Sequence, residues 1–348
     1  MKKQVKERNS YIDIVKAILI ILVIIGHSIQ YGSGSNFIKK ELFFNNYLFK
    51  FIYSFHMPLF IMISRYLSYN SINKNKIKDV FKSKISTLLI PILIWTIPVL
   101  LFKINEVTTI REFIKLSIKT FSTNLWFLWS VFYINILVKI INKYFKDNYL
   151  VYILVFLITF ILPNELIIKQ FTFQFSLYSY MYFYFIIGYL SKKHNIIEKI
   201  NKYINNKTLI VNSILFILLL LFMNKNTYIY TSGMNILSNY KQLIIDLYRF
   251  LLGLIGSTEV LLLINILQNK LNDNIKNKLI YLGKNTLGIY IISSIIHPFI
   301  LPLITKNLSN INYLFILLES IIILVISITA IELIKKNKYT NKFLLGEK

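Results

Sequence analysis

The sequence predicts an all-α integral membrane protein, a single bundle of about ten transmembrane helices with both termini in the cytoplasm. Of its 348 residues, 55% are hydrophobic, which exceeds the apolar share of typical soluble domains once glycine is set aside. These residues fall in long blocks without the period-two alternation of strands, so helices are predicted and an outer-membrane barrel is not. The chain has no cysteine and four scattered histidines, so we expect neither disulfides nor a metal site.

Each span should take about twenty apolar residues. The first apolar block is too long and too charged for a cleaved signal peptide, and we expect it to remain as the first span. One transmembrane domain is predicted to fill residues 1–348, with no repeat, linker or soluble domain. The ten predicted spans lie near residues 11–30, 47–69, 85–103, 125–142, 149–163, 174–191, 208–223, 242–268, 284–304 and 313–334.

The distribution of basic residues supports this count. The chain carries 40 Lys and Arg against 15 Asp and Glu, a formal net charge of +25. With a cytoplasmic N-terminus, the segments on that side hold 26 basic residues and the opposite segments hold 11. Because basic loops tend to stay in the cytoplasm, this asymmetry predicts a multi-pass protein of the bacterial cytoplasmic membrane. It also explains the positive charge without a nucleic-acid partner.

The first span, "YIDIVKAILIILVIIGHSIQ", carries polar residues inside an apolar helix. Charge within a bilayer costs a few kcal/mol even on lenient scales, so Asp13, Lys16 and His27 require an explanation. Lys16 and His27 lie within about 20° of the same helix face and about 16 Å apart along the axis. Asp13 lies on that side as well, which predicts one polar stripe running through the membrane.

The second span, "FIYSFHMPLFIMISRYLSY", runs in the opposite direction and repeats the pattern. It places His56 towards the outer side and Arg65 towards the inner side. Two histidines at one depth and two cations at another predict a polar channel, with cations for a phosphate-bearing ligand and a neutral histidine for proton abstraction from a hydroxyl. Two alternatives stay open: Lys16 and Arg65 snorkel to the headgroups, and each histidine is only a hydrogen-bonded packing residue.

The eighth span contains a second group of charged residues. Asp246 and Arg249 stand at i and i+3, so they can pair with each other. Alternatively, Arg249 orients an acidic or hydroxylated acceptor. Glu259 lies deeper in the span. Its negative charge either balances the positive charge of Lys16 or Arg65, or its carboxyl group relays protons.

Other polar and aromatic residues receive simpler interpretations. Trp126 and Trp129 lie at the outer edge of the fourth span. We interpret them as residues that anchor the helix at the membrane interface rather than as a surface on which a sugar stacks. Asn285 and Tyr290 are further candidates for the cavity wall.

These motifs resemble the membrane acyltransferase-3 family, and in particular its fucose O-acetylase-like branch. "YIDIVKAILIILVIIGH" resembles the family opening, in which a basic residue, ten residues and a histidine follow one another. "SFHMPLFIMISRYL" is similar to the family's "FHMPLFFFISGYLF". "KSKISTLLIPILIW", "NLWFLWSVF", "YFIIGYL" and "LGKNTLGIY" resemble later signatures, so that the likeness spans about residues 10 to 300.

The resemblance implies a membrane O-acyltransferase. Such enzymes pass a short acyl group, commonly acetyl, from cytoplasmic acyl-CoA to a hydroxyl of a saccharide or glycolipid acceptor, with no permanently bound cofactor. His27 is then the catalytic base or a transient acyl carrier, with His56 beside it. The remaining roles that we assign are CoA binding by Lys16, Arg65 and Lys84, and acceptor binding by Asp13, Arg249 and Glu259.

Two positions depart from the family pattern. Arg65 stands where the family usually has glycine, either as an added phosphate contact or as a change in packing. Ser293 stands where a histidine is usual, and His297 follows four residues later, so the function of that histidine is shifted or lost. A transporter or flippase for a lipid-linked or polyanionic envelope substrate is the alternative function, although no inverted repeat is evident. A purely structural scaffold leaves the buried charges unexplained.

Overall fold

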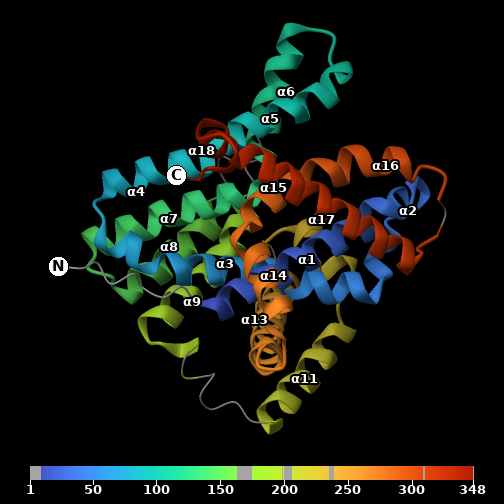
Figure 1. Cartoon of the computed structure of the whole chain (residues 1–348). Helices are drawn as coiled ribbons and strands as arrows, with labels where there is room; N and C mark the ends of the chain where they lie inside the picture. The colour runs from blue at the N-terminus through green and yellow to red at the C-terminus, as the bar shows by residue number, and fades with distance from the viewer. Residues whose placement is uncertain are drawn as a thin grey trace.

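The computed structural model describes residues 9–162, 175–197, 199, 206–234, 239–308 and 310–347. Every regular element in these residues is a helix (Figure 1). In chain order they are α1 (Ser10–Gly32), α2 (Ser35–Lys39), η1 (Leu42–Asn45), α3 (Tyr47–Lys74), α4 (Ile77–Lys84), η2 (Ile85–Leu89), α5 (Ile90–Lys103), η3 (Ile104–Glu106), α6 (Ile110–Thr123), α7 (Trp126–Tyr144), α8 (Tyr149–Leu162), α9 (Phe175–Lys193), α11 (Asn206–Leu221), η5 (Lys225–Thr227), α12 (Ile229–Ser232), α13 (Tyr240–Gln268), α14 (Asp273–Lys284), α15 (Thr286–Ile295), η6 (Ile296–Ile300), α16 (Leu301–Ile304), α17 (Tyr313–Lys335) and α18 (Lys338–Leu345).

Asparagine side chains fix where many of these helices begin. An Asn side chain immediately before a helix can accept a hydrogen bond from one of the first, otherwise unpaired backbone N–H groups. Asn46, for example, accepts a 3.0 Å hydrogen bond from Phe49 N at the start of α3. The helices α1, α3, α13, α14, α17 and α18 are capped in this way, by Asn9, Asn46, Asn239, Asn272, Asn312 and Asn337 respectively.

The predicted spans all overlap helices, but not all of these helices are long enough to cross a membrane alone. Six of the described helical runs are long and apolar enough, and they match the first three and the last three predicted spans: Ser10–Gly32, Tyr47–Lys74, Ile77–Lys103, Tyr240–Gln268, Thr286–Ile304 and Tyr313–Lys335. α6 and α7 form a bent pair at 66°, which gives seven candidates if it counts as one span. α8 and α11 are shorter apolar helices, and the predicted fifth and sixth spans lie partly outside the described residues. The count of ten and the location of the termini therefore stay predictions.

α1 and α3 form the centre of the bundle. α1 packs against α3, α14 and α17, and α3 packs against α9 and α13. Glycines permit two of these close approaches, because a methyl group at Gly283 would overlap the Asp13 carbonyl and one at Gly188 would overlap the Met62 carbonyl. The Asp13 end of the polar stripe of α1 therefore packs closely against α14.

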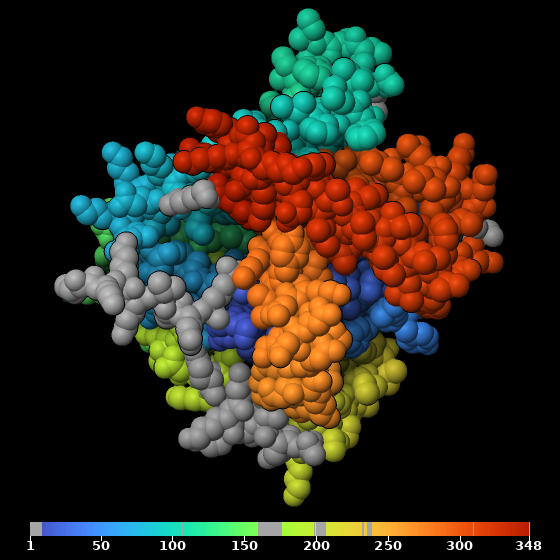
Figure 2. Space-filling model, viewed as in Figure 1, coloured from blue at the N-terminus to red at the C-terminus, as the bar shows by residue number. Residues whose placement is uncertain are grey.

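α5 and α6 form a hairpin that projects from the rest of the molecule (Figures 1 and 2). Many of its large apolar residues are exposed, among them Leu101, Ile110 and Ile118. α6 also exposes Arg111, Lys115 and Lys119, and a helix that combines exposed apolar and basic residues is typical of a membrane interface. The base of this hairpin forms part of the wall of the candidate site.

Candidate active site

An inner cavity of about 360 Å³ is lined by residues of α1, α3, α4 and α7. Lys16 of α1 and Lys84, the last residue of α4, provide its cationic groups, and most of the remaining wall is apolar. Lys16 also pairs with Asp13 one helical turn earlier, at 3.6 Å, while Asp13 itself lies outside the lining. Two ammonium groups in an otherwise apolar cavity can bind an anionic group such as a phosphate.

An outer cavity of about 380 Å³ contains three of the four histidines. His27 comes from α1, His56 from α3 and His297 from η6. The ring centroids of His27 and His297 are 5.2 Å apart, and the Tyr53 ring lies 6.1 Å from that of His27. The two predicted catalytic histidines are thus brought together with a third.

Two of these imidazoles have a defined tautomer. His56 Nδ1 lies 2.8 Å from the Ile52 carbonyl, and His297 Nδ1 lies 2.8 Å from the Ser293 carbonyl. Since a carbonyl only accepts hydrogen bonds, both Nδ1 atoms carry the proton, and in the neutral rings Nε2 is left as an acceptor. His297 Nε2 lies 3.4 Å from Ser28 Oγ, which can donate to it.

The Nδ1 atom of His27 forms no such hydrogen bond to a backbone carbonyl of the described residues. It is buried, and within the described part of the chain it has no hydrogen-bond partner. A buried unpaired imidazole nitrogen is unfavourable unless a ligand or water completes it. His27 is therefore the histidine of this group with a ring nitrogen that no described residue satisfies.

His297 is the residue that the sequence analysis could not place. It lies in η6, a π-helical turn, directly before Pro298, whose missing N–H interrupts the regular helical hydrogen bonds. His297 stands one turn beyond Ser293 and bonds to its carbonyl. His297, one turn after Ser293, thus lines the outer cavity, and it stays a prediction that the imidazole of the family pattern is shifted along the helix rather than lost.

The two cavities are adjacent. Val23, Met57 and Tyr290 line both of them and form their common wall. Lys16 and His27, eleven residues apart on α1, are separated by about 16 Å of helix rise. The arrangement is therefore two adjacent cavities, with Lys16 and Lys84 in one and three imidazoles in the other, and it predicts a ligand path between them.

Arg65 lies away from this path. Its side chain is fully buried between α3 and α9, where the guanidinium carbon stands 4.4 Å from the ring centroid of Tyr189 and 5.3 Å from that of Phe185. In the described residues its nitrogens have no hydrogen-bond partner. Arg65 does not line the inner cavity, so its predicted CoA contact is not assembled here, and cation–π stacking is what the structure supplies.

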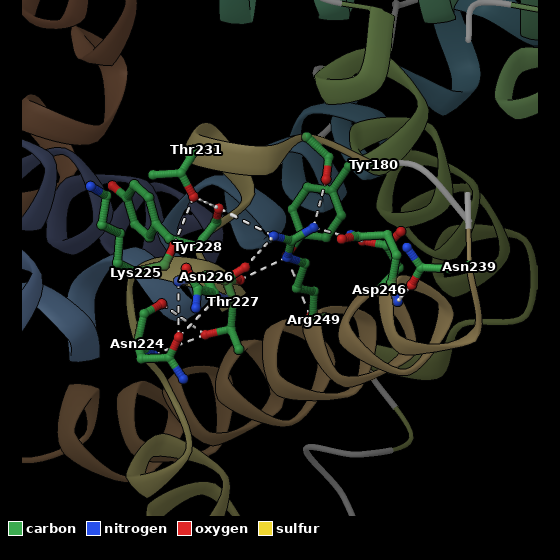
Figure 3. Close-up of polar contacts among 12 residues, drawn as sticks. Tyr180, Asn224, Lys225, Asn226, Thr227, Tyr228, Thr231, Asn239, Asp246 and Arg249 are labelled. Atoms are coloured by element: carbon green, nitrogen blue, oxygen red, sulfur yellow. Dashed lines mark hydrogen bonds and ion pairs between the residues drawn. The ribbon is translucent and has the colours of Figure 1, made fainter. Parts of the chain in front are cut away.

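Arg249 binds the protein itself (Figure 3). It pairs with Asp246 at 2.6 Å and donates to the carbonyls of Asn226, Thr227, Tyr228 and Gly233. These contacts engage all five N–H groups of the guanidinium. The pairing with Asp246 was one of the two sequence interpretations, and the geometry leaves Arg249 no donor for an acceptor.

Glu259 is also engaged within the bundle. Its carboxylate accepts hydrogen bonds from Asn212 Nδ2 (2.8 Å) and Ser213 Oγ (2.6 Å), which join α13 to α11. It lines neither cavity. Of the predicted site residues, the structure thus brings Lys16 and Lys84 to one cavity and His27 and His56 to the other, while Arg65, Arg249 and Glu259 lie elsewhere.

Aromatic residues complete the outer cavity. Trp126, interpreted from sequence as an interface anchor, lines it together with Tyr53, Tyr228, Tyr230 and Tyr290. Apolar periodicity alone could not identify them, because Tyr228 and Tyr230 lie in a short connection between predicted spans. Among the described residues, no group of three His, Asp or Glu is placed to hold a metal ion.

Comparison with known proteins identifies the family of the chain. Residues 9–333 match the acyltransferase-3 family, described as an acyltransferase domain, and the chain belongs to this family. Nodulation protein NolL of Sinorhizobium fredii is 30% identical over 234 residues, 65% of this chain and 60% of that protein. Nodulation protein NolL of Mesorhizobium japonicum is 33% identical over 141 residues, 39% of this chain and 37% of that protein. The chain thus aligns with less than two thirds of the length of either relative, and no solved structure matches it.

Proposed function

We propose that this protein transfers a short acyl group, most simply acetyl, from cytoplasmic acyl-CoA to a hydroxyl of a cell-envelope or exported saccharide. Membership of the acyltransferase-3 family supports acyl transfer in general. The observation that carries the more specific proposal is the pair of adjacent cavities, with Lys16 and Lys84 in one and His27, His56 and His297 in the other.

The donor fits this path by length and charge. The phosphates of the nucleotide bind at Lys16 and Lys84, which are accessible from the inner cavity. The pantetheine arm then extends past Val23, Met57 and Tyr290 and carries the thioester to His27. On the topology predicted from charge, the nucleotide lies on the cytoplasmic side and the acceptor enters from the outer side.

The chemistry needs one base in the outer cavity. The His27 imidazole accepts the proton of the acceptor hydroxyl while the oxygen attacks the thioester carbonyl carbon. The carbon–sulfur bond then breaks, and the imidazolium returns the proton to the departing CoA thiolate. The products are an ester and the CoA thiol, and the imidazole is restored. If His27 instead carries the acyl group, acetyl-CoA alone will leave an acetyl group on His27, which mass spectrometry detects.

Radiolabelled acetyl-CoA provides the test. Membrane vesicles of known orientation are loaded with it and supplied outside with envelope polysaccharide from the source cell. The proposal predicts label on the polysaccharide only when acetyl-CoA is on the cytoplasmic face. Translocation of the saccharide without label would contradict transfer and favour a transporter or flippase.

A further inference from the structure

Residues 226–233 form a short segment that Arg249 holds in place (Figure 3), and two of them, Tyr228 and Tyr230, line the outer cavity. Its carbonyls converge on the guanidinium, with hydrogen bonds of 2.7 Å from Nε to Thr227 O and 2.6 Å from Nη1 to Gly233 O. Arg249 is 3% exposed and its partner Asp246 is 0% exposed. A buried ion pair that also satisfies several backbone carbonyls fixes a loop more firmly than a hydrophobic contact would.

The segment needs this support because its helical elements are short. It comprises the end of η5 and the four-residue helix α12, and it closes at Gly233 with a φ of 65°. Glycine adopts this backbone conformation without the steric cost that other residues meet. Such short turns leave carbonyls without helical partners, and Arg249 supplies the missing donors.

The same segment presents two aromatic side chains to the cavity. Tyr228 and Tyr230 both line it, with ring centroids 5.2 Å apart. Tyr230 meets Trp126 edge-to-face at 5.4 Å and Tyr53 at 6.2 Å. Since Tyr53 in turn contacts His27 at 6.1 Å, an aromatic wall runs from Trp126 to the reacting histidine.

The composition of this cavity indicates its occupant. Its wall combines aromatic rings with hydrogen-bonding side chains, including those of Gln30, Thr123 and Asn124. Lys103 is the only Lys or Arg among the described residues that line it, and no Asp or Glu is among them. A sugar ring has apolar C–H faces and hydroxyl edges, and it matches such a wall better than an ionic ligand does.

We propose that Trp126, Tyr228 and Tyr230 form the acceptor subsite, on which a sugar ring stacks, and that Arg249 is the positioning residue that holds Tyr228 and Tyr230 there. This inference rests on the proposed acyl transfer and assigns the acceptor to a defined wall. It also gives Arg249 a function in acceptor binding that needs no contact with the acceptor.

Acceptor kinetics test the proposal. The purified full chain is assayed with acetyl-CoA and either methyl α-L-fucoside or methyl N-acetyl-β-D-glucosaminide, with glycerol as a hydroxyl compound that lacks a ring face. Release of the CoA thiol is followed with a thiol reagent, and the protein adds no background because it contains no cysteine. We expect saturable acceleration by at least one glycoside and none by glycerol.

Variants then distinguish a specific loss of acceptor binding from a general disruption of the fold. Trp126→Ala and Tyr230→Ala should each raise the acceptor KM about tenfold, because each removes one stacking surface, and the KM for acetyl-CoA should stay unchanged. Arg249→Lys should raise the acceptor KM similarly, since one ammonium group cannot bind four carbonyls and a carboxylate. Tyr248→Ala is the matched control, because Tyr248 neighbours Arg249 but bonds to Leu219 O and does not line the cavity.

The outcomes distinguish the two proposals. Normal transfer with an unaltered acceptor KM in Trp126→Ala and Tyr230→Ala contradicts the aromatic subsite alone. A rise only in the acetyl-CoA KM also contradicts it, and would mean that the adenine ring occupies this wall. If the native protein shows no acceptor-dependent thiol release with either glycoside, both the proposed function and the subsite fail.

Discussion

The imidazole rings of His27 and His297 lie 5.2 Å apart, although the two residues come from opposite ends of the chain. His297 is held by the Ser293 carbonyl, whereas His27 Nδ1 has no partner in the described residues. We propose that this contrast gives them different functions: His27 exchanges protons with a substrate, and His297 orients its neighbour or the substrate.

Replacement of the histidines should therefore have graded effects. His27→Ala should lower kcat about a hundredfold to ten-thousandfold, as expected for loss of a general base, with normal expression and membrane insertion. His297→Ala should lower it less. His194→Ala serves as the control, because His194 lies outside the cavity and contacts Tyr149. Near-native turnover of His27→Ala would refute its assignment.

The lysines of the inner cavity should determine donor affinity. Lys16→Ala and Lys84→Ala should each weaken acetyl-CoA binding about fivefold to thirtyfold, because each removes one charged hydrogen bond to a phosphate. The effect should shrink for acetyl-pantetheine, which lacks the nucleotide. Lys82→Ala, an exposed neighbour outside the cavity, should be neutral in calorimetry. Equal losses for both donors would point to general disruption of the fold.

Arg65 should contribute less to acetyl-CoA binding than Lys16 does. Its guanidinium stacks on Tyr189 and does not line the inner cavity. Arg65→Met keeps most of the side-chain volume and removes the charge, so we expect acetyl-CoA affinity to change less than in Lys16→Ala. A loss equal to that of Lys16→Ala would show that Arg65 does reach the phosphates.

The connection between α7 and α8 provides a test of stability against pH. Asp147 accepts hydrogen bonds from Lys193 (2.7 Å) and Tyr152 (2.6 Å). Burial alone would raise the pKa of its carboxyl group, but these hydrogen bonds outweigh burial and lower the pKa from its ordinary value of 3.8. The carboxylate therefore stabilises the fold above about pH 4, and this contribution is lost as the pH falls through the lowered pKa.

Asp147→Asn should accordingly reduce the free energy of unfolding by about 1.5–3 kcal/mol at neutral pH, the range for hydrogen bonds to charged groups. Thermal unfolding in detergent measures this as a lower Tm, and the difference from the native chain should narrow on acidification. Asp79→Asn, at an exposed position of α4, is the control. A difference that stays constant down to acidic pH would contradict the ionised pairing.

Much of this site could be predicted from sequence because it follows from helix geometry. Lys16 and His27 share a face of α1 by spacing alone, and the opposite direction of α3 brings His56 to the depth of His27. The surroundings of the Arg65 side chain could not be predicted, because they depend on which helix packs against that face of α3, and in the structure this helix is α9. His297 reaches the cavity through a π-helical turn, which periodicity does not reveal.

The function of Arg249 illustrates a different limit. Its charge in an apolar span predicts either an internal partner or a ligand, and the sequence indicates only Asp246 as that partner. The four carbonyls that it also binds belong to a connection more than fifteen residues earlier. Only the folded structure shows that these groups use every donor of the guanidinium.

A cryo-electron microscopy structure with a non-hydrolysable acetyl-CoA analogue tests the central claim most directly. We predict nucleotide density beside Lys16 and Lys84, with the pantetheine arm passing Val23 and Met57 and the sulfur position adjacent to His27. Nucleotide density in the outer cavity among His27, His56 and His297, with the arm directed towards the lysines, would contradict the account.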